Sequence, residues 1–327
     1  MTEKGPEHIG VFTSGGDSPG MNAAIRAVVR SAFFHGIKVT GILGGYDGLV
    51  HDRTIPMGPR DVSNIIQRGG TILRSARSEA FRTPEGRKKA KATLDAHGIN
   101  ALIAIGGDGT FAGALKLHEE HGVHTIGLPG TIDNDLVGTD HSIGSDTALN
   151  TAMQAIDRIR DTASSHDRLF FVEVMGRDTG FLALSCAVAA GAEFVMVPEK
   201  KESIDELVKV LSDAAGSKSS SIVVVAEGDE QGGAFDVARK VKEKFTHYDT
   251  RVAVIGHMQR GGSPTVNDRL LASRTGVAAV EALLEGKSNV MVGLVDGRIE
   301  FTAFEKAIAK RKRLDKELYR ILRILAI

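Results

Sequence analysis

The sequence predicts an α/β protein with two doubly wound domains and mainly parallel sheets. Three observations predict this fold class. Several short runs are apolar throughout instead of alternating with polar residues, as expected for strands buried on both faces. Many runs lead into a glycine-rich turn and then a helical pattern, and strands that alternate with helices form parallel βαβ units. The length of 327 residues corresponds to roughly two domains of about 150 residues each.

The strand–turn–helix unit recurs along the first half of the chain. Glycine supports this interpretation, because many of its 38 residues follow apolar runs, where the backbone turns sharply or approaches a ligand. The first predicted unit is a strand at 8–13, a turn at 14–20 and a helix at 21–34. The second is a strand at 101–105, a turn at 106–110 and a helix to about residue 120. The third is a strand at 125–128 followed by a turn at 129–135.

The second half of the chain continues the same pattern. A helix at 145–161 is the predicted crossing into a second domain, and a charged helix followed by a Gly/Ser/Lys loop is predicted within 203–220. The glycines near 256–262 resemble the early units, which suggests that the chain returns to the first domain. Three further strands are predicted, at 169–174, 221–226 and 251–256.

The C-terminal tail differs from the rest of the chain. Residues 304–327 are predicted to form one helix, with eight Lys or Arg residues between 306 and 323. Its apolar residues are Leu314, Leu318, Leu322 and Leu325. This pattern predicts an amphipathic helix that docks by its apolar stripe and leaves a basic face in solvent, with an anion or partner surface as the alternative.

Composition narrows the class of protein further. The 41 Lys and Arg residues balance 41 Asp and Glu residues, so the chain has no global electrostatic reason to bind nucleic acid or an anionic membrane. The single cysteine, Cys186, excludes an intramolecular disulfide and fits a reducing compartment. The polar N-terminus predicts no signal peptide, and the longest uncharged apolar stretch, 181–192, is too short to span a bilayer. A soluble cytoplasmic protein is expected.

Charged side chains closely follow the apolar runs. In open α/β sheets, ligands bind beyond the carboxyl ends of the strands, where the strand order reverses. Because these side chains all fall at such positions, we expect one shared cleft between the two domains. The residues are Asp17, Asp108, Asp133, Asp135, Arg177, Glu227, His257 and Arg260.

Two glycine turns, at Gly15-Gly16 and at 106–110, predict a phosphate site, since their backbone N–H groups face an anion without an intervening Cβ. No Walker A motif is present, and residues 107–112 fit the dinucleotide fingerprint only formally. In that loop the Asp108 carboxylate would repel a pyrophosphate unless a cation stood between them. Mg²⁺ removes this conflict, so Asp108 favours a magnesium nucleotide over NAD.

The segment 131–135 places the carboxylates of Asp133 and Asp135 just past a strand. They are either turn-forming residues or an acid–base pair in which one carboxylate accepts a proton from a substrate hydroxyl that attacks phosphorus. Such a reaction also needs positive charge, and arginine suits phosphate because its planar fork donates two parallel hydrogen bonds. The cationic candidates are Arg77, Arg168, Arg177, Arg251, His257 and Arg260.

These motifs, taken in order from about residue 9 to about residue 297, resemble the bacterial 6-phosphofructokinase family. NAD kinases and diacylglycerol kinases carry a loop similar to Gly-Gly-Asp-Gly-Thr, but the segments at 131–135 and 259–262 separate this chain from them. The segments that carry the resemblance are 13–17, 19–22, 106–110, 129–135, 175–177 and 256–262.

The resemblance implies ATP and fructose 6-phosphate as substrates and Mg²⁺ on Asp108. It implies that Asp133 is the base for the 1-hydroxyl, with Thr131 and Asp135 beside it. It also implies that Arg77 and Arg177 stabilise the charge on the transferred phosphoryl group. The ATP-binding residues that it implies are Gly15, Arg77, Ser78, Gly107, Asp108, Gly109 and Thr110. The substrate-binding residues are Thr131, Asp133, Arg168, Met175, Gly176, Arg177, Glu227, Arg251, His257 and Arg260.

The resemblance also implies a homotetramer, because Arg168 and Arg251 reach the sugar pocket from a neighbouring subunit in the family. It places an ATP-binding domain at 1–144 with 259–308, and a fructose 6-phosphate-binding domain at 145–258 with 309–327. The chain departs from the family at Ser78, where an aromatic residue is common, and near Lys218, where basic residues are fewer. An effector site for ADP or phosphoenolpyruvate would comprise Arg26, Arg30, Arg53, Arg160, Glu193 and Lys218.

The phosphoryl donor separates two branches of this family. Pyrophosphate-dependent relatives carry Asp where this chain has Gly109 and Lys where it has Gly130. An aspartate at 109 would repel the α-phosphate of ATP, so glycine predicts ATP as the donor. The alternatives are a pyrophosphate-dependent enzyme, a non-catalytic sugar-phosphate or nucleotide sensor on the same fold, and an oxidoreductase based on the dinucleotide fingerprint.

Overall fold

The computed structural model describes residues 5–163, 165, 168–215, 220–309 and 311–326. The chain forms two compact units. Unit 1 comprises Met1–Ile132, Leu136–Thr147 and Arg260–Lys312. Unit 2 comprises Asp133–Asp135, Ala148–Gln259 and Arg313–Ile327. Each unit has its own sheet and its own hydrophobic core.

The sheet of unit 1 is built from β1 (His8–Thr13), β2 (Lys38–Ile42), β3 (Thr54–Met57), β4 (Ala101–Gly106), β5 (His124–Pro129), β10 (Val290–Val295) and β11 (Arg298–Ala303). Among the described residues the strand order is β11-β10-β5-β4-β1-β2-β3. The strands are parallel except for β3 and β11, which pair antiparallel at the two edges. The order reverses between β1 and β4, because β2 and β4 lie on opposite sides of β1.

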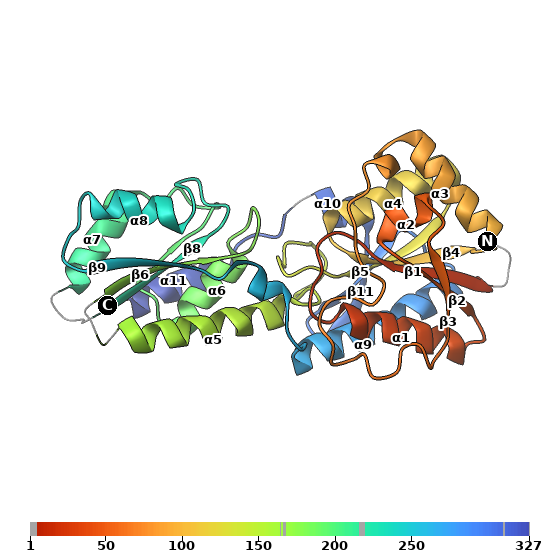
Figure 1. Ribbon diagram of the computed structural model, residues 1–327, viewed down its shortest axis with the longest axis horizontal. Coiled ribbons are helices and arrows are strands. Elements are labelled where there is room, and N and C mark those ends of the chain that lie inside the picture. The colour runs from red at the N-terminus through yellow and green to blue at the C-terminus, as the bar shows by residue number, and fades with distance from the viewer. Residues whose placement is uncertain (1–4, 164, 166–167, 216–219, 310, 327) are drawn as a thin grey trace. The chain divides into compact units, whose positions relative to one another are not determined.

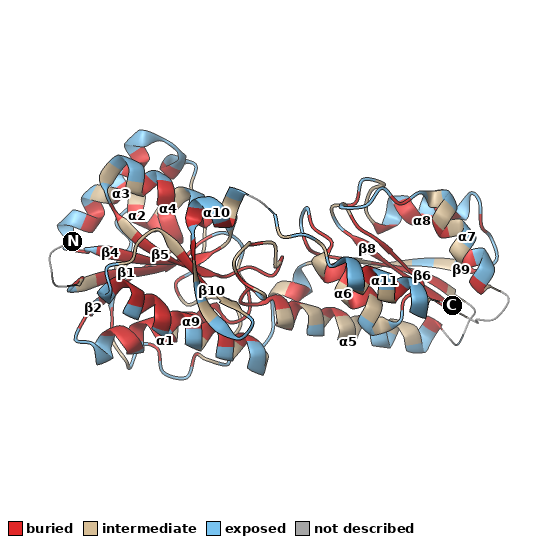
Figure 2. Ribbon diagram, turned by 180° about the vertical axis from the view of Figure 1, so that it is seen from behind, coloured by how far each residue is buried: buried red, intermediate tan, exposed pale blue. Residues whose placement is uncertain are grey.

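Helices cover both faces of this sheet (Figure 1). On one face, α1 (Met21–Phe34) and α9 (Val266–Leu284) pack on Ile103 and Ile105 of β4. On the other face, Leu102 and Ala104 pack with Tyr46, Leu94 and Leu117. Residues 101–105 of β4 are therefore all buried, and Figure 2 shows the central strands in the colour of buried residues. The remaining elements are α2 (Gly45–Val50), η1 (Ala80–Arg82), α3 (Pro84–Ala96), α4 (Asp108–His121) and α10 (Phe304–Ala309).

The sheet of unit 2 consists of β6 (Arg168–Val174), β7 (Phe194–Met196), β8 (Ser221–Ala226) and β9 (Asp249–Val254). The strands are parallel in the order β7-β8-β6-β9. Val172 of β6 packs with α5 (Ser145–Ala163), α6 (Phe181–Ala190) and α11 (Lys316–Leu325), whereas Phe171 packs with α7 (Ile204–Ala214) and α8 (Ala234–Lys242). A short 3₁₀ helix, η2 (Gly256–Arg260), follows β9.

The predicted fold class of two doubly wound α/β domains with mainly parallel sheets is confirmed. The six predicted strands are present, although the one expected at 251–256 ends at Val254. Sequence analysis missed β2, β3, β7, β10 and β11. The last two form an antiparallel hairpin at a sheet edge, outside the strand–turn–helix pattern. No helix in the described part of the chain is long and apolar enough to cross a membrane.

The prediction of one helix over 304–327 is wrong. The tail forms α10 and α11, and residues 311–315 between them are irregular. The side chain of Asp315 caps α11 by accepting hydrogen bonds from the N–H groups of Glu317 and Leu318, so a new helix begins there. Leu322 of α11 is buried in unit 2, as the apolar stripe predicts, but Leu325 is 62% exposed.

The unit boundaries at 147/148, 259/260 and 312/313 lie within four residues of the predicted ones at 144/145, 258/259 and 308/309. One difference concerns the candidate site: Asp133–Asp135 group with unit 2, whereas their neighbours on both sides belong to unit 1. The ligand assigned to each domain stays a prediction.

Candidate active site

The first candidate surface lies at the carboxyl ends of β1 and β4, where the strand order of unit 1 reverses. This reversal is the position at which open α/β sheets bind ligands. The turn after β1 contains Gly15, whose φ is +84°, and β4 ends at Gly106, directly before the first turn of α4. The predicted phosphate turns therefore lie side by side, because Thr13 of β1 pairs with Ile105 of β4.

Two close approaches explain why β4 ends in glycine. A Cβ on Gly106 would lie 2.2 Å from Thr110 Oγ1 and 2.6 Å from the Ser14 carbonyl oxygen. The Thr110 hydroxyl donates a hydrogen bond of 3.3 Å to this carbonyl and thereby ties α4 to the turn after β1. Because α4 begins at Asp108, the predicted loop residues 108–110 are the first helical turn, so their N–H groups form a helix N-terminus.

Asp108 and Gly109 are both exposed at this helix N-terminus. The Asp108 carboxylate accepts a hydrogen bond of 2.8 Å from the Gly109 N–H group. Among the described residues, nothing lies within 4 Å of a Cβ built on Gly109, so the space beside it is open. An exposed carboxylate beside a helix N-terminus suits Mg²⁺ in a nucleotide complex, since that ion is bound by one or two carboxylates together with substrate phosphates.

Beneath this turn, Tyr46 supports the start of α4. Its hydroxyl donates a hydrogen bond of 2.5 Å to the Thr110 carbonyl oxygen, and its ring stacks on Phe81 with centroids 4.0 Å apart. Gly113 leaves room for the Tyr46 ring, which a Cβ at that position would meet at 2.7 Å. Burial raises the pKa of the Tyr46 hydroxyl. Sequence analysis missed Tyr46, which no local motif marks.

Arg77 and Ser78 follow a long segment that is tied to the same edge. The buried side chain of Asn22 donates to the carbonyls of Arg68 and Gly69 and accepts from the N–H group of Ile72. Arg77 is exposed, so its side chain is accessible to a ligand. Ser78 donates a hydrogen bond of 3.1 Å to Asp47, so its hydroxyl already has a protein acceptor.

Thr131 lies beside the phosphate turn of unit 1, since its Cβ is 3.7 Å from the position of a Cβ on Gly107. Its carbonyl accepts a hydrogen bond of 2.7 Å from Ser142, which fixes the end of the segment. Two residues later, Asp133 is buried, and Asp135 is partly buried. Between them, Asn134 has a φ of +51°, a left-handed conformation that asparagine tolerates better than most residues.

Arg260, at the end of η2, belongs to unit 1. Its guanidinium donates a hydrogen bond of 3.0 Å to the carbonyl of Asp17, in the turn after β1. A Cβ on Gly16 would lie only 2.4 Å from Nη1 of Arg260, so the second glycine of that turn makes room for this arginine. The structure therefore places a cation next to the turn after β1, one of the two predicted phosphate turns.

The second candidate surface lies at the carboxyl ends of β6, β8 and β9 in unit 2. One oxygen of Glu227, after β8, accepts hydrogen bonds from the N–H groups of Arg177 (2.7 Å) and Gly176 (3.3 Å), after β6. Arg177 has a φ of +56°, and both its side chain and that of Glu227 are exposed. The neighbouring Met175 is buried. Tertiary structure thus brings together residues about 50 positions apart in the sequence.

Gln259 completes this surface and was missed as a site residue. It is fully buried, and its Oε1 accepts a hydrogen bond of 2.8 Å from the Met175 N–H group. This bond joins the end of β6 to η2, which also carries the exposed His257. Its place in the motif 256–262 was the signal that could have identified it.

Arg168 and Arg251 do not lie at the carboxyl edge of unit 2. Arg168 is the first residue of β6, six residues before Val174, a distance of about 20 Å along the strand. Arg251 forms an ion pair of 2.6 Å with Asp249, the first residue of β9, so its guanidinium is held toward the amino end of the sheet. Arg168 lies 3.8 Å from the same carboxylate. Within one chain, these two arginines are separate from Arg177 and Glu227.

The predicted effector residues are divided between the units. Arg26 and Arg30 lie one turn apart on α1, where burial and then the charge of Arg30 lower the pKa of Arg26. Arg53 forms an ion pair with Asp47. In unit 2, Arg160 donates to the carbonyls of Ala190 and Gly191, and buried Glu193 accepts from the N–H group of Ile222. Lys218 lies outside the described residues, and the effector site stays a prediction.

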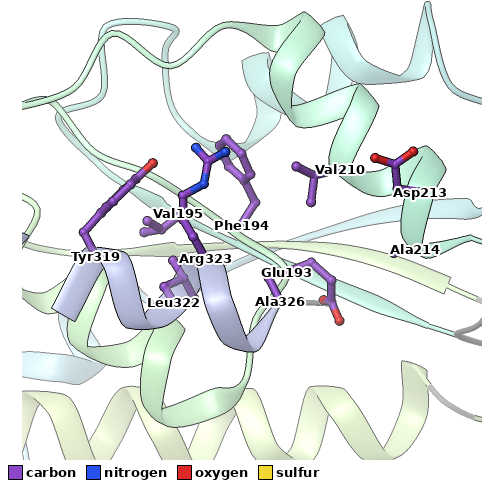
Figure 3. Close-up of a pocket in the computed structure, with 10 residues that line it drawn as sticks. All are labelled: Glu193, Phe194, Val195, Val210, Asp213, Ala214, Tyr319, Leu322, Arg323 and Ala326. Carbon is purple, nitrogen blue, oxygen red and sulfur yellow. The ribbon is translucent and has the colours of Figure 1, made fainter. Parts of the chain in front are cut away.

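A cavity of about 330 Å³ lies in unit 2 between α11, α7 and β7. Figure 3 shows its lining: the ring of Tyr319 and the guanidinium of Arg323 extend from α11, and Asp213 extends from α7. Phe194 and Val195 of β7 contribute apolar side chains to the wall. The cavity is distinct from the carboxyl-edge residues Arg177 and Glu227, which do not line it.

The two edges define a class of protein. One unit presents two glycine turns, a helix N-terminus and an exposed carboxylate, which together suit the phosphates of a nucleotide. The other presents an arginine, a histidine and a glutamate, which suit an anionic polar substrate. The chain is a two-domain α/β protein with the features of a phosphotransferase.

The chain belongs to the phosphofructokinase family. The family model described as "Phosphofructokinase" matches residues 8–283. Over 98% of this chain and all of the relative, it is 57% identical to "ATP-dependent 6-phosphofructokinase 1" of Thermus thermophilus. It is 53% identical to "ATP-dependent 6-phosphofructokinase 2" of Bacteroides thetaiotaomicron, over 98% of each chain.

Solved structures show the same fold. The phosphofructokinase of Pichia pastoris in the T-state matches with a TM-score of 0.87 and 36% identity, over 94% of this chain and 36% of the Pichia chain. This chain thus spans about a third of that protein. A pyrophosphate-dependent phosphofructokinase from Marinobacter aquaeolei matches with a TM-score of 0.84 over 98% of this chain and 91% of its own. At 22% identity, that match shows the fold alone.

Proposed function

We propose that the chain transfers the γ-phosphoryl group of ATP to the 1-hydroxyl of D-fructose 6-phosphate, a step of glycolysis. The products are fructose 1,6-bisphosphate and ADP. The observation that carries this proposal is the 57% identity, along the whole length, to a protein named ATP-dependent 6-phosphofructokinase. The open space beside Gly109 supports ATP over pyrophosphate, because it leaves room for the α-phosphate.

In this proposal the edge of unit 1 binds ATP. Backbone N–H groups from the first turn of α4 and from Gly15 donate to the phosphates, and Arg77 approaches from the long segment beside this edge. Asp108 would hold Mg²⁺, which when bound neutralises phosphate charge and orients the transferred group. Thr131, beside Gly107, contacts the same phosphoryl group.

The edge of unit 2 binds the sugar phosphate in this proposal. Asp133 accepts the proton of the 1-hydroxyl as its oxygen attacks phosphorus, with Asp135 nearby, and Arg177 stabilises the charge of the phosphoryl group in flight. Glu227 holds the Arg177 backbone and, with Met175, Gly176 and His257, lines the sugar site. Arg260 is also proposed to contribute positive charge to the binding of the sugar phosphate.

We further propose a homotetramer with shared sites. Arg168 and Arg251 lie toward the amino end of their sheet, so the 6-phosphate at the carboxyl edge of the same chain is out of their reach. In the proposed tetramer, a neighbouring subunit supplies its own Arg168 and Arg251 to bind the 6-phosphate. ADP or phosphoenolpyruvate as effector and the cytoplasm as location stay predictions.

One coupled assay tests the proposal. Formation of fructose 1,6-bisphosphate is measured with ATP or pyrophosphate as donor, with and without Mg²⁺, and a separate reaction with NAD tests the oxidoreductase alternative. We expect turnover only with ATP and Mg²⁺. Turnover with pyrophosphate alone would assign the chain to the other donor class, and sugar-phosphate binding without ADP formation would make it a sensor.

Asp133→Asn tests the assignment of the base. Removal of a general base lowers kcat by about two to four decades, while calorimetric binding of fructose 6-phosphate stays near wild type. The control is Asp205→Asn, which changes an exposed carboxylate of α7 that pairs with Lys244. We expect this variant to keep full turnover. Near-normal kcat in Asp133→Asn would refute the role of Asp133.

A further inference from the structure

We infer that Glu199 is a positioning residue for phosphoryl transfer, and that the C-terminal helix α11 holds the segment that carries it. Glu199 fixes one end of the Arg177 loop, defined as residues 175–180. The inference rests on the proposed function, in which Arg177 acts on the transferred phosphoryl group. All the contacts involved lie within unit 2.

The Arg177 loop is anchored at both ends by carboxylates. At its start, Glu227 accepts hydrogen bonds from the N–H groups of Gly176 and Arg177. At its end, both carboxylate oxygens of Glu199 lie 3.0 Å from the N–H group of Gly180. Arg177 has a left-handed φ of +56°, a conformation that persists in a non-glycine residue only when its surroundings hold it. The second anchor therefore bears on where the Arg177 side chain points.

Glu199 lies in the segment after β7, which packs directly against the end of the Arg177 loop. A Cβ on Gly180 would lie 2.4 Å from Val197 Cγ1 and 2.9 Å from Glu199 Oε2, so only glycine allows this approach. Gly180 immediately precedes α6, and a negative charge at a helix N-terminus is favourable. The Glu199 carboxylate thus stabilises the loop end and the first turn of α6.

Helix α11 holds the segment that carries Glu199. The Lys200 ammonium lies 3.3 Å from the ring centroid of Tyr319, whose hydroxyl donates a hydrogen bond to buried Glu202. One turn further along α11, Arg323 pairs with Glu206 of α7 at 2.9 Å. Helix α11 therefore contacts Lys200, Glu202 and Glu206, which closely follow the anchor Glu199 in the sequence.

The packing around α11 makes these polar contacts important. Tyr319 and Leu322 pack with Ala183 and Ala187 of α6, which begins at the end of the Arg177 loop. On its β7 side, however, α11 borders the cavity of about 330 Å³ (Figure 3). Core packing holds α11 on α6, and on the cavity side the polar contacts of Tyr319 and Arg323 link the helix to the segment that carries Glu199. This arrangement gives the basic tail a role in the reaction.

Four variants test the inference: Glu199→Ala, Glu199→Gln, Tyr319→Phe and Arg320→Ala. Arg320 is the control, because it lies on α11 and pairs with Glu317 of the same helix. Each variant is measured for kcat, for KM of both substrates and for thermal unfolding. Hydrogen–deuterium exchange with mass spectrometry of peptides covering 175–182 reports on the loop without using activity.

We expect Glu199→Ala to lower kcat by about tenfold to a hundredfold, the effect of losing a charged hydrogen bond, with KM for ATP near wild type. Glu199→Gln keeps an acceptor for Gly180 and restores most of kcat. Tyr319→Phe, which keeps the ring beside Lys200, lowers kcat less. In Glu199→Ala and Tyr319→Phe the loop exchanges faster, and Arg320→Ala matches wild type throughout.

Wild-type kcat and unchanged loop exchange in Glu199→Ala would overturn the inference, as would an equal loss in Arg320→Ala. If Glu199→Ala does not fold, Glu199→Gln and Tyr319→Phe still decide between the outcomes. If wild-type protein transfers no phosphoryl group, the proposed function fails, and the exchange data test the anchor by themselves.

Discussion

At the scale of single residues, the candidate nucleotide site depends on where side chains are absent. Gly106 has no space for a Cβ, because Thr110 and the Ser14 carbonyl fill it, whereas Gly109 borders open space. Packing therefore requires glycine at position 106. At position 109 the surrounding structure leaves room for a side chain, so we attribute that glycine to the proposed ligand. Gly130 is also required by packing, since a Cβ there would lie 2.8 Å from Ile105 Cγ2.

Gly109→Asp is expected to abolish use of ATP without unfolding the protein. The new carboxylate would enter the open space where the α-phosphate is proposed to bind, and repulsion between such close charges costs enough to lower kcat/KM for ATP by roughly a hundredfold or more. Steady-state kinetics and a thermal melt measure the two effects.

Gly109→Ala is the matched control, because it adds a Cβ to the same open space without a charge. We expect its ATP kinetics and its melting temperature to stay close to wild type. Unchanged ATP kinetics in Gly109→Asp would contradict the proposed position of the nucleotide. An equal loss in Gly109→Ala would show that steric exclusion, not charge, sets donor choice.

At the scale of elements, each candidate surface is made by strand order. In unit 1, β1 and β4 are neighbours although about 90 residues separate them, and this pairing puts the two phosphate turns together. In unit 2, β6 pairs with both β8 and β9, which brings Arg177, Glu227 and Gln259 to one edge. The start of α4 is then fixed by the buried hydrogen bond from Tyr46.

Tyr46→Phe is expected to destabilise unit 1 by about 1–2 kcal/mol at neutral pH, because it leaves the Thr110 carbonyl without this donor. Burial raises the pKa of the Tyr46 hydroxyl, so the unfolded chain loses this proton at a lower pH than the folded protein. Its contribution is therefore present below the ordinary tyrosine value of about 10 and is lost as pH rises above it.

The measurement is thermal unfolding of wild type and Tyr46→Phe between neutral pH and pH of about 11. Subtraction of the two curves removes the effect of other alkaline titrations. We expect the stability difference to shrink above the ordinary tyrosine pKa. A difference that stays constant over the whole range would show that the Tyr46 hydroxyl does not titrate with unfolding.

At the scale of the whole molecule, one chain does not collect all the predicted substrate residues at one edge. Arg168 and Arg251 gather around Asp249 near the amino end of β9, whereas Arg177 and Glu227 lie at the carboxyl end of the same sheet. A site that uses all four residues requires a second copy of the chain. This separation supports the proposed sharing of sites between subunits.

Mixing two inactive variants tests the shared site. Arg251→Ala and Asp133→Asn are each expected to have low activity, and they are unfolded and refolded together at equal amounts. Because some mixed interfaces then contain one intact Asp133 and one intact Arg251, about a quarter of wild-type activity should return by random assortment. Refolding each variant alone is the control. No recovery in the mixture would place each site within a single chain.

Much of the fold was predictable from local patterns, because strands buried on both faces are apolar throughout and the glycine turns follow them. The edge strands β3 and β11 were not predictable in this way, since they are short or half-exposed and pair antiparallel. The break in the tail was missed because its basic and apolar spacing fits a helix on both sides, and only the cap by Asp315 reveals a new start.

The sequence by itself determined the fold class and predicted the glycine turns and the acidic residues of the candidate site, because each depends on residue types at short spacing. Tertiary structure alone decided which distant residues meet: Glu227 with Arg177, Gln259 with Met175, and Tyr46 with Thr110. It also decided that Arg168 and Arg251 lie apart from Arg177. The physical reason is that strand order and register, which long-range packing selects, set these contacts, and no local pattern encodes them.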